Sequence, residues 1–454
     1  MSISEWRATG ALALVLACRM LGLFIVLPVL SLAATDYPDA TPLMVGLALG
    51  GYGLTQALFQ IPLGWLSDRI GRRPVVVLGL AVFILGSLLA AVADSMAGVV
   101  WGRLLQGAGA ISSTIMALVA DVTRDESRSQ AMAVVGGSIG LAFMAAMVAG
   151  PGIADALGVS AVFVVTAALA GLALLLFSFL VPQAGSSSAG AESRIPVGAV
   201  LKDSELWRLN FGVFTLHFSM MASFLAVPLI FTQQLGVGAG MHWHYYLPIL
   251  VLSFCTMLPA LILGETRRKN KAVLIGGILV LVASQLAFAV DSSSWRGVVG
   301  ALFFFFVAFN LLEALLPALV SRQAPASAKG AAMGLFATAQ FLGAFCGAAL
   351  GGAVLQHWSA RYGNAPLFGL LAGLGICWVV VAAGMARPRY LVRYRVPVDA
   401  GADAQQVQAL LAQLAATEGV DEVSVAPGEP GVFLKADPRR LAGDVIDRLS
   451  LSRA

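Results

Sequence analysis

Charged residues are scarce in this chain. Only 11% of its 454 residues are Asp, Glu, Lys or Arg, whereas 59% are hydrophobic. A soluble domain carries about a quarter charged residues, so this balance excludes an ordinary soluble protein and predicts an integral membrane protein. The formal net charge of +4 does not indicate a nucleic-acid partner, because the basic residues concentrate in one class of loop.

Cysteine is rare as well. Cys18, Cys255, Cys346 and Cys377 lie inside apolar runs, and no two of them form a CxxC pair. The sequence therefore predicts neither a disulfide framework nor a metal site. A GxxxxGK[ST] phosphate loop is also missing, which argues against direct use of ATP. We expect no enzymatic activity and no cofactor.

Long apolar runs dominate what is present. Each is long enough to cross a bilayer as a helix, and the first continues as a span without a separate cleavable signal. The sequence thus predicts an all-α polytopic membrane protein with twelve transmembrane helices. The runs lie at about 8–30, 43–66, 75–93, 97–120, 130–151, 159–181, 208–232, 244–263, 272–290, 297–320, 331–355 and 364–385.

The loops between these runs alternate in basic charge. One set holds only Arg296 and Arg361. By the positive-inside rule, the richer set faces the cytoplasm, and an even number of spans places both termini there. We expect a multi-pass protein of the cell inner membrane. The richer set holds Arg7, Arg69, Arg72, Arg73, Arg124, Arg128, Arg194, Lys202, Arg208, Arg267, Arg268, Lys269, Lys271, Arg322, Lys329 and Arg387.

The spans fall into two groups of six. Residues 182–206 form the longest connection, and its Gly- and Ser-rich start is typical of a flexible cytoplasmic linker. Residues 1–181 and 207–386 resemble each other, which predicts two repeated six-helix bundles related by an axis along the membrane normal. The matches are Ala117-Leu118-Val119 with Ala318-Leu319-Val320, Arg128 with Lys329, Met132 with Met333, Pro62 with Pro259, and Asp68 with Glu265.

A charged decapeptide joins the second and third spans. Residues 64–73 read Gly-Trp-Leu-Ser-Asp-Arg-Ile-Gly-Arg-Arg. Its glycines permit a tight turn between helices. Its acid and arginines lie where the chain re-enters the membrane, available for contacts with neighbouring helix ends. The motif residues are Gly64, Asp68, Gly71, Arg72 and Arg73; the second-half copy around Glu265 lacks the glycines.

Three further segments complete a family resemblance. Residues 103–109 read RLLQGAG, Gly150-Pro151 lies near the end of the fifth span, and residues 19–30 carry RMLG and LPVL. With the decapeptide, these segments resemble the major facilitator superfamily of secondary transporters, and the first span resembles its drug:proton antiporter branch. The antiporter motif GxxxGPxxGG is matched only in part, since Ala146 and Ala154-Asp155 replace glycines.

The resemblance implies that spans 1, 4, 7 and 10 line a central cavity. Each carries one charged or titratable residue, whose placement at membrane depth costs free energy: Arg19, Arg103, His217 and Glu313. Glu313, which follows Asn310 by one helical turn, is the only carboxylate well inside a span, so we expect it to carry a coupling proton. His217 titrates nearest neutrality and is the second candidate. Structural roles are the alternatives, as an arginine partner for Glu313 and as a packing residue for His217.

The two arginines are expected to act electrostatically, because an arginine does not usefully release a proton. Arg103 either biases a neighbouring acid or holds a substrate anion. Arg19 does the same or hydrogen-bonds helix backbone.

The resemblance also implies a conformational latch. It places Asp68 beside the cytoplasmic start of the eleventh span, near residues 327–330, where a helix dipole favours a carboxylate. Arg72 and Asp121 are expected to extend the latch as an ion pair. By pseudo-symmetry, Glu265 is expected to face the start of the fifth span near Ser127.

Glycines at intervals of three or four residues predict close helix packing in two spans. Gly343, Gly347 and Gly351 form such a face in the eleventh span. Residues 136–140 hold three glycines to which we assign the same role in the fifth.

Hydrophobicity falls after Met385, and residues 387–454 form a separate cytoplasmic pattern. Strands are expected at 389–396, 423–425 and 432–434, and helices at 403–414 and 438–449. This βαββα order resembles a small α+β ferredoxin-like domain whose last strand is missing or very short. Because the segment holds no cysteine, metal binding through paired cysteines is not expected.

These features together predict a proton-coupled secondary transporter that exports hydrophobic or amphipathic small molecules. The alternatives are a uniporter or symporter for a polar metabolite, and a ligand sensor that uses the transporter fold. The expected partners are a small-molecule substrate, protons and the lipid bilayer, with no nucleic acid. We expect a monomer in the membrane, whose C-terminal domain contacts itself or the cytoplasmic loops.

Overall fold

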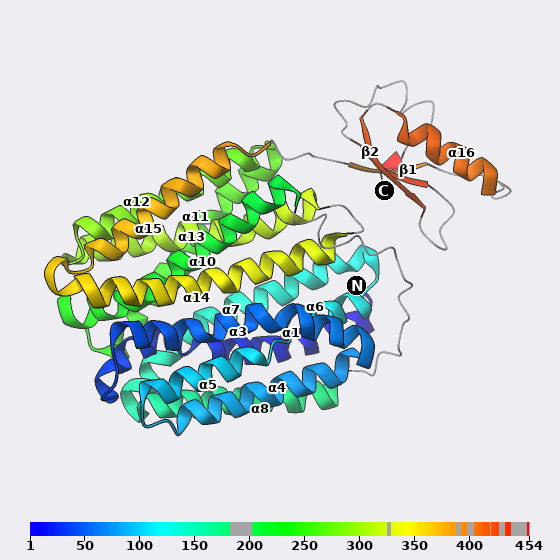
Figure 1. Cartoon of the computed structure of the whole chain (residues 1–454). Helices are drawn as coiled ribbons and strands as arrows, with labels where there is room; N and C mark the ends of the chain where they lie inside the picture. The colour runs from blue at the N-terminus through cyan, green and yellow to red at the C-terminus, as the bar shows by residue number, and fades with distance from the viewer. Residues whose placement is uncertain are drawn as a thin grey trace. The chain divides into compact units, whose positions relative to one another are not determined.

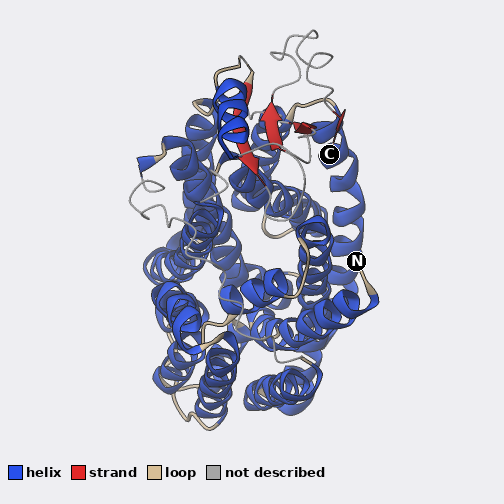
Figure 2. Cartoon of the chain, turned by 90° about the vertical axis from the view of Figure 1, so that its right-hand side faces the viewer, coloured by secondary structure: helices blue, strands red, loops and turns tan. Residues whose placement is uncertain are grey.

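The computed structural model describes residues 1–181, 202–324, 328–386, 392–396, 404–417, 419–425, 432–436 and 452–453. The chain divides into two compact units, Met1–Ala386 and Arg387–Ala454. The first consists of long helices that run side by side (Figures 1 and 2). Of the predicted linker at 182–206, residues 182–201 lie outside the described part.

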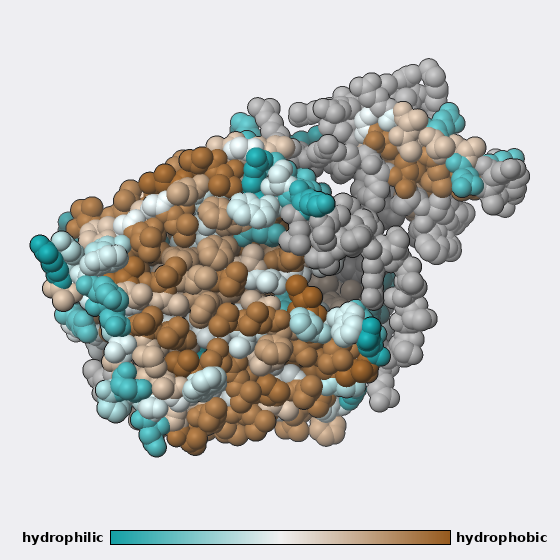
Figure 3. Space-filling model, viewed as in Figure 1, coloured by the Kyte–Doolittle hydropathy of each residue, from teal (hydrophilic) through white to brown (hydrophobic). Residues whose placement is uncertain are grey.

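Twelve helices in the described part of the first unit are long and apolar enough to cross a membrane, as predicted. Apolar side chains cover the middle of this unit and polar ones gather towards its two ends (Figure 3). The spans are α1 (Ile3–Phe24) with α2 (Leu27–Leu30), α3 (Pro42–Ile70), α4 (Arg72–Ala91), α5 (Met96–Ala108) with α6 (Ser112–Asp121), α7 (Asp125–Leu157), α8 (Val159–Leu180), α10 (Ser204–Leu229) with the π-helix η2 (Ile230–Gln234), α11 (Trp243–Thr266) after the 3-10 helix η3 (Ala239–Met241), α12 (Asn270–Val290), α13 (Trp295–Gln323), α14 (Lys329–Tyr362) and α15 (Ala365–Ala383).

The fourth span is interrupted where α5 ends and α6 begins. Neighbouring helices approach so closely here that only glycine fits: a Cβ at Gly107 would lie 2.1 Å from the Tyr52 carbonyl oxygen, and one at Gly109 2.3 Å from that of Gly79. Interrupting a helix frees backbone carbonyls from their usual partners. The Gly109 carbonyl is thus available to a side chain.

The two halves of the helical unit meet closely between α3 and α14. A Cβ at Gly46 would lie 2.2 Å from the Ala348 carbonyl oxygen, and one at Gly352 2.4 Å from that of Pro42. These residues lie in the half of each helix that the charge pattern assigns to the periplasm. The structure is therefore closed at the predicted periplasmic end.

Glycine packing is confirmed in one predicted span and wrong in the other. On α14, Cβ atoms at Gly343 and Gly347 would each lie 2.2 Å from a carbonyl oxygen of α10, that of Phe214 or Phe218. On α7, the glycines at 136–140 have no neighbour within 4 Å of their Cβ positions. Their spacing matched a packing face, but no described residue of another helix lies within 4 Å of these Cβ positions.

The second unit contains a small antiparallel sheet and a helix. Its described elements are β1 (Val392–Val396), α16 (Ala404–Ala415), β2 (Val420–Val425), β3 (Val432–Ala436) and β4 (Ser452–Arg453), with strand order β2-β3-β1-β4. Leu414 of α16 packs with Tyr394, Val432 and Leu434 in its core. The helix predicted at 438–449 lies outside the described residues, and the ferredoxin-like assignment stays a prediction.

Candidate functional site

His217 and Glu313 meet between two helices of the second half. His217 lies on α10 and Glu313 on α13, and the distance from His217 Nε2 to Glu313 Oε2 is 3.7 Å. Gln340 of α14 contacts both residues: its Nε2 is 2.8 Å from His217 Nε2 and 3.4 Å from Glu313 Oε1. The ring of Phe309 packs against the imidazole with centroids 5.7 Å apart. Three helices thus converge on one titratable pair.

The two oxygens of Glu313 have different surroundings. Oε1 accepts from Gln340, whereas Oε2 is buried and accepts no hydrogen bond from any residue that the structure describes. The side chain as a whole is 41% exposed, whereas that of His217 is 8% exposed. A buried oxygen without a donor is costly while the carboxyl is ionised. Oε2 is therefore the oxygen of Glu313 that has no hydrogen-bond partner in the described residues, 3.7 Å from the imidazole.

Among the described residues, Asn310 has its hydrogen bond with Ser253 and not with His217 or Glu313. Its Nδ2 donates to Ser253 Oγ at 3.1 Å and so joins α13 to α11. Its position one turn before Glu313 makes it a neighbour of the pair along the helix, with a separate hydrogen-bond partner.

Arg19 is fully buried inside the first half. Its guanidinium donates to the Gly109 carbonyl at 3.1 Å, which uses the acceptor that the interruption of the fourth span frees. It also donates to Tyr52 Oη at 2.9 Å, Gln56 Oε1 at 3.2 Å and Ser112 Oγ at 3.2 Å. Each of these four bonds goes to a neutral acceptor.

Arg103 is likewise fully buried. It donates to the carbonyls of Ala48 at 3.1 Å and Leu49 at 3.4 Å, and to Gln106 Oε1 at 2.7 Å. Gln106 in turn donates to Ser87 Oγ at 2.7 Å. These bonds tie α5 to α3 and α4. The structure therefore does not bring the two arginines to the acid at Glu313.

Matching positions of the two halves carry different chemistry. Ser112 precedes Glu313 by 201 positions, which is the offset between Ala117 and Ala318 in the repeat. Arg19 precedes His217 by 198 positions. In the first half, the cation Arg19 donates to the hydroxyl of Ser112. In the second half, the titratable groups His217 and Glu313 occupy the matching positions.

The decapeptide forms a tight corner between α3 and α4. Gly71 adopts φ +95°, a conformation that favours glycine. Arg72 contacts Asp68, and the ion pair expected with Asp121 is present, with Arg72 Nε 3.3 Å from Asp121 Oδ2. Gly64 faces α6, because its Cβ position is 3.5 Å from Ser113 Oγ.

Arg73 reaches a different helix end. It donates to the carbonyls of Ser178 at 2.6 Å and Val181 at 3.1 Å, at the C-terminus of α8. Lys271, 198 positions later, donates likewise to Ala383 at 2.8 Å and to Met385, at the end of α15. Cations at helix C-termini are favoured by the helix dipole. Both halves thus hold their last helix in the same way.

The second-half copy of the decapeptide pairs within its own half. Glu265 accepts from Arg322 at 2.6 Å and from Asn270 at 3.1 Å. Arg322 occupies the position equivalent to Asp121 and has the opposite charge. The expectation that Glu265 faces the start of the fifth span near Ser127 stays a prediction. Arg268 takes the place of Gly71 and keeps a positive φ of 54°.

Gly150 and Pro151 lie where α7 crosses the interruption of the first span. A Cβ at Gly150 would lie 2.5 Å from the Ile25 carbonyl oxygen. Pro151 follows inside α7 and removes one backbone donor. This part of the antiporter motif therefore permits close approach of α7 to the junction between α1 and α2.

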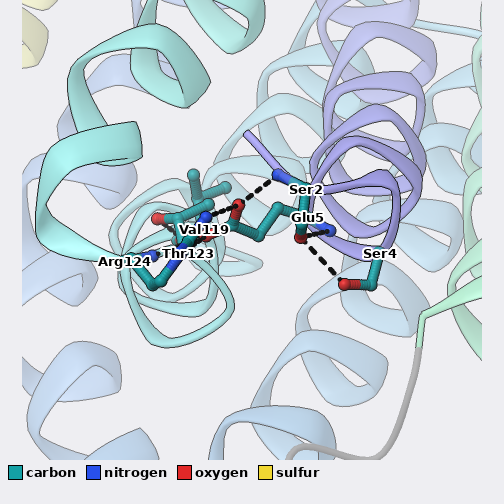
Figure 4. A network of polar contacts seen from close by, with 6 residues as sticks. All are labelled: Ser2, Ser4, Glu5, Val119, Thr123 and Arg124. Atoms are coloured by element: carbon teal, nitrogen blue, oxygen red, sulfur yellow. Dashed lines mark hydrogen bonds and ion pairs between the residues drawn. The ribbon is translucent and has the colours of Figure 1, made fainter.

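The sequence analysis missed a polar contact at the N-terminus (Figure 4). The Glu5 carboxylate accepts from the Ser2 backbone at 2.6 Å and from the Arg124 backbone and Nε at 2.9 and 3.2 Å. It thereby joins the start of α1 to the connection between α6 and α7. The available signal was the Ser2–Glu5 spacing, which forms a capping box.

Two acids outside the spans accept hydrogen bonds near helix N-termini at the predicted periplasmic end. Asp39 accepts from the backbone of Met96 at 2.7 Å and Ala97 at 3.1 Å, and these bonds hold its carboxyl pKa below the usual value. Hydrogen bonds from Ser294 lower the pKa of Asp291 in the same way. The described residues contain no cluster of three or more His, Cys, Asp or Glu arranged to hold a metal.

Comparison with known proteins agrees with these features. Residues 12–325 match the Major Facilitator Superfamily. Inner membrane transport protein YajR of Escherichia coli is 41% identical over 97% of this chain and 96% of its own length. Multidrug resistance protein MdtH of Aeromonas salmonicida is 27% identical over 75% of this chain and 86% of that protein.

A solved structure shares the fold. A bacterial homolog of the human lysosomal transporter Spinster, in an inward-facing and occupied conformation, has a TM-score of 0.67 over 84% of this chain and 96% of its own, at 14% identity. With twelve spans, the family match and a full-length relative, this chain belongs to the Major Facilitator Superfamily and is a multi-pass transport protein of the inner membrane.

Proposed function

We propose that this chain is a proton-coupled transporter that exports hydrophobic or amphipathic small molecules by alternating access. The observation that carries the proposal is the His217–Glu313 pair inside the spans, 3.7 Å apart. Ionisable groups at membrane depth are rare and mark ion or proton pathways. The name of one relative, a multidrug resistance protein, supports export over uptake.

Two features of the pair support proton coupling. The Glu313 side chain is 41% exposed, yet its Oε2 is buried beside the imidazole. A proton on Oε2 would remove the free-energy cost of burying an anionic oxygen that has no hydrogen-bond donor. A change in water access between two states of the transporter then changes the proton affinity of the pair.

An aromatic cluster supports an apolar substrate. Phe143 of α7 packs against Phe24 of α1 with ring centroids 5.3 Å apart. It also packs against Phe224 of α10 at 6.4 Å and Phe306 of α13 at 6.3 Å. Rings from both halves therefore pack on one another, with Phe224 and Phe306 buried. They would present an apolar surface to a ligand when the two halves separate at this place.

The proposal is tested by the sign of a pH change in proteoliposomes. A ligand-stabilisation screen of hydrophobic dyes, with Hoechst 33342 as the first probe, selects the compound to be used. A gradient of that compound should alkalinise the compartment that the compound enters, because protons leave in exchange. Acidification would indicate symport, and the absence of any proton movement would support the uniporter or the sensor.

A further inference from the structure

Gln340 is the neutral residue that joins the two titratable side chains. It lies on α14, and its Nε2 is 2.8 Å from His217 Nε2 and 3.4 Å from Glu313 Oε1. An ionised carboxylate only accepts hydrogen bonds, so an amide NH2 group is the correct partner for it. The same NH2 group then faces His217 Nε2, which has to accept as well.

The other imidazole nitrogen determines the protonation of the ring. His217 Nδ1 is 3.2 Å from the Val213 carbonyl oxygen, one turn earlier on α10. A carbonyl only accepts, so Nδ1 carries a proton in every state of the ring. With Nε2 accepting from Gln340, the imidazole is neutral. In this arrangement His217 Nδ1 donates to Val213, and both Nε2 and Glu313 Oε1 accept from the Gln340 amide.

Other groups around His217 leave this assignment unchanged. The helices packed against α10 include α3, α13, α14 and α15. In their described residues, α13 brings Glu313, whereas α3 brings Tyr52, whose hydroxyl donates to Gln56 at 2.9 Å. Cys346 of α14 lies about two turns beyond Gln340, and Cys377 of α15 is exposed.

We propose that Gln340 is a positioning residue that keeps His217 Nε2 free of a proton, so that the coupling proton goes to Glu313. Protonation at His217 Nε2 would place two donors against each other. The amide of Gln340 then turns by half a rotation about its terminal torsion and presents Oε1, a movement with a soft barrier for an sp³–sp² bond. Gln340 therefore opposes protonation of His217 and changes its hydrogen bonds if His217 takes up a second proton. This inference rests on the proposed proton coupling.

The test uses the full-length protein and its own histidines. The chain has four histidines, so ¹⁵N-histidine labelling gives four imidazoles, and His217→Ala identifies the signal of interest. The ¹⁵N shifts report which nitrogen carries the proton. In wild type, the neutral ring should carry it on Nδ1. In Gln340→Met, which keeps the length of the side chain but removes its donor, the cation should appear about one pH unit higher, the effect expected for one hydrogen bond.

Gln285→Met is the matched control, because Gln285 is a fully buried glutamine on α12 whose amide atoms have no partner in the described residues. It should leave the His217 titration where it is in wild type. An unchanged titration in folded Gln340→Met, or a neutral ring protonated on Nε2, would overturn the inference. If Gln340→Met misfolds, the tautomer of the wild-type protein still decides it.

The two proposals fail in distinguishable ways. If Glu313→Gln abolishes proton-driven transport while Gln340→Met leaves the His217 titration unchanged, only the role of Gln340 is wrong. If Gln340→Met moves the titration while Glu313→Gln still transports uphill, proton coupling through Glu313 is wrong.

Discussion

Single charged residues inside the spans have two kinds of surroundings. Arg19 and Arg103 are permanent cations that donate to neutral acceptors and join helices of the first half. Glu313 differs, because one of its oxygens is buried without a donor in the described residues. The arginines join helices through several hydrogen bonds each, although Arg19 Nε is buried without a partner in the described residues.

Asp39 supplies a prediction about pH. Its lowered pKa means that the carboxylate stabilises the fold fully above about pH 4, the ordinary range of Asp, and that this contribution disappears as the pH falls through the lowered value. Asp39→Asn should therefore lower the melting temperature more at pH 6 than at pH 3, measured on purified protein in detergent. Asp94→Asn removes a nearby charge as a control. An equal effect of Asp39→Asn at both pH values would contradict the assignment.

The ionisable residues could be found in the sequence, but their grouping could not. Arg19, Arg103, His217 and Glu313 are conspicuous because charge is costly in an apolar run. Their hydrogen-bond partners are backbone carbonyls and neutral side chains, which do not stand out in a sequence. The Gly109 carbonyl that accepts from Arg19 is one example. Gln340 was missed for the same reason, since a neutral glutamine does not stand out.

At the scale of helices, glycine determines where the two halves touch. The twelve spans follow from the apolar runs. The interruption between α5 and α6, in contrast, lies where α3 packs against Gly107 and α4 packs against Gly109. Glycine spacing alone did not separate the packed glycines of α14 from the open ones of α7. The difference lies in which helix happens to face them.

A methyl group at Gly46 should open the predicted periplasmic end. The added Cβ would lie 2.2 Å from the backbone oxygen of Ala348, which is unable to move like a side chain. Overpacking of this kind costs about 1–3 kcal/mol, and 1.4 kcal/mol changes an equilibrium about tenfold. Gly46→Ala should therefore increase labelling of a Val29→Cys reporter by an impermeant thiol reagent about tenfold. Gly276→Ala, where a Cβ has open space, is the control and should change nothing.

Asp68 supplies the corresponding prediction for the other end. We propose that it latches α3 to the start of α14 when the halves close there, an attraction to the helix dipole of about 0.3–1 kcal/mol. Asp68→Asn should lower transport and raise thiol labelling of a Gly136→Cys reporter on α7. Asp94→Asn is the charge-matched control. Unchanged labelling in a folded Asp68→Asn protein would refute the latch.

At the scale of the whole molecule, the two halves repeat the same fold with different charges. Arg322 occupies the place of Asp121, and Glu313 that of Ser112. The repeat was visible in the sequence, but the exchange of partners at Glu265 was not, because it depends on the sign of a residue on another helix. The first half thus carries the fixed cations and the second half the titratable pair.

The C-terminal unit should be dispensable for folding of the membrane unit. Residues 387–454 form a separate compact unit with its own apolar core and contribute none of the twelve spans. A chain that ends at Pro388 should insert into the membrane and elute as a single symmetric peak in size-exclusion chromatography. Aggregation of this truncation beside a well-behaved full-length chain would show that the two units depend on each other.

Proton-driven uphill transport by Glu313→Gln tests the central claim most directly. Glutamine keeps the shape of the side chain but does not titrate. In proteoliposomes with an imposed proton gradient, wild type should accumulate the selected dye against its gradient, and Glu313→Gln should not. The variant should still bind the dye and exchange it downhill. Uphill accumulation by Glu313→Gln equal to that of wild type would contradict the assignment of the coupling proton to Glu313.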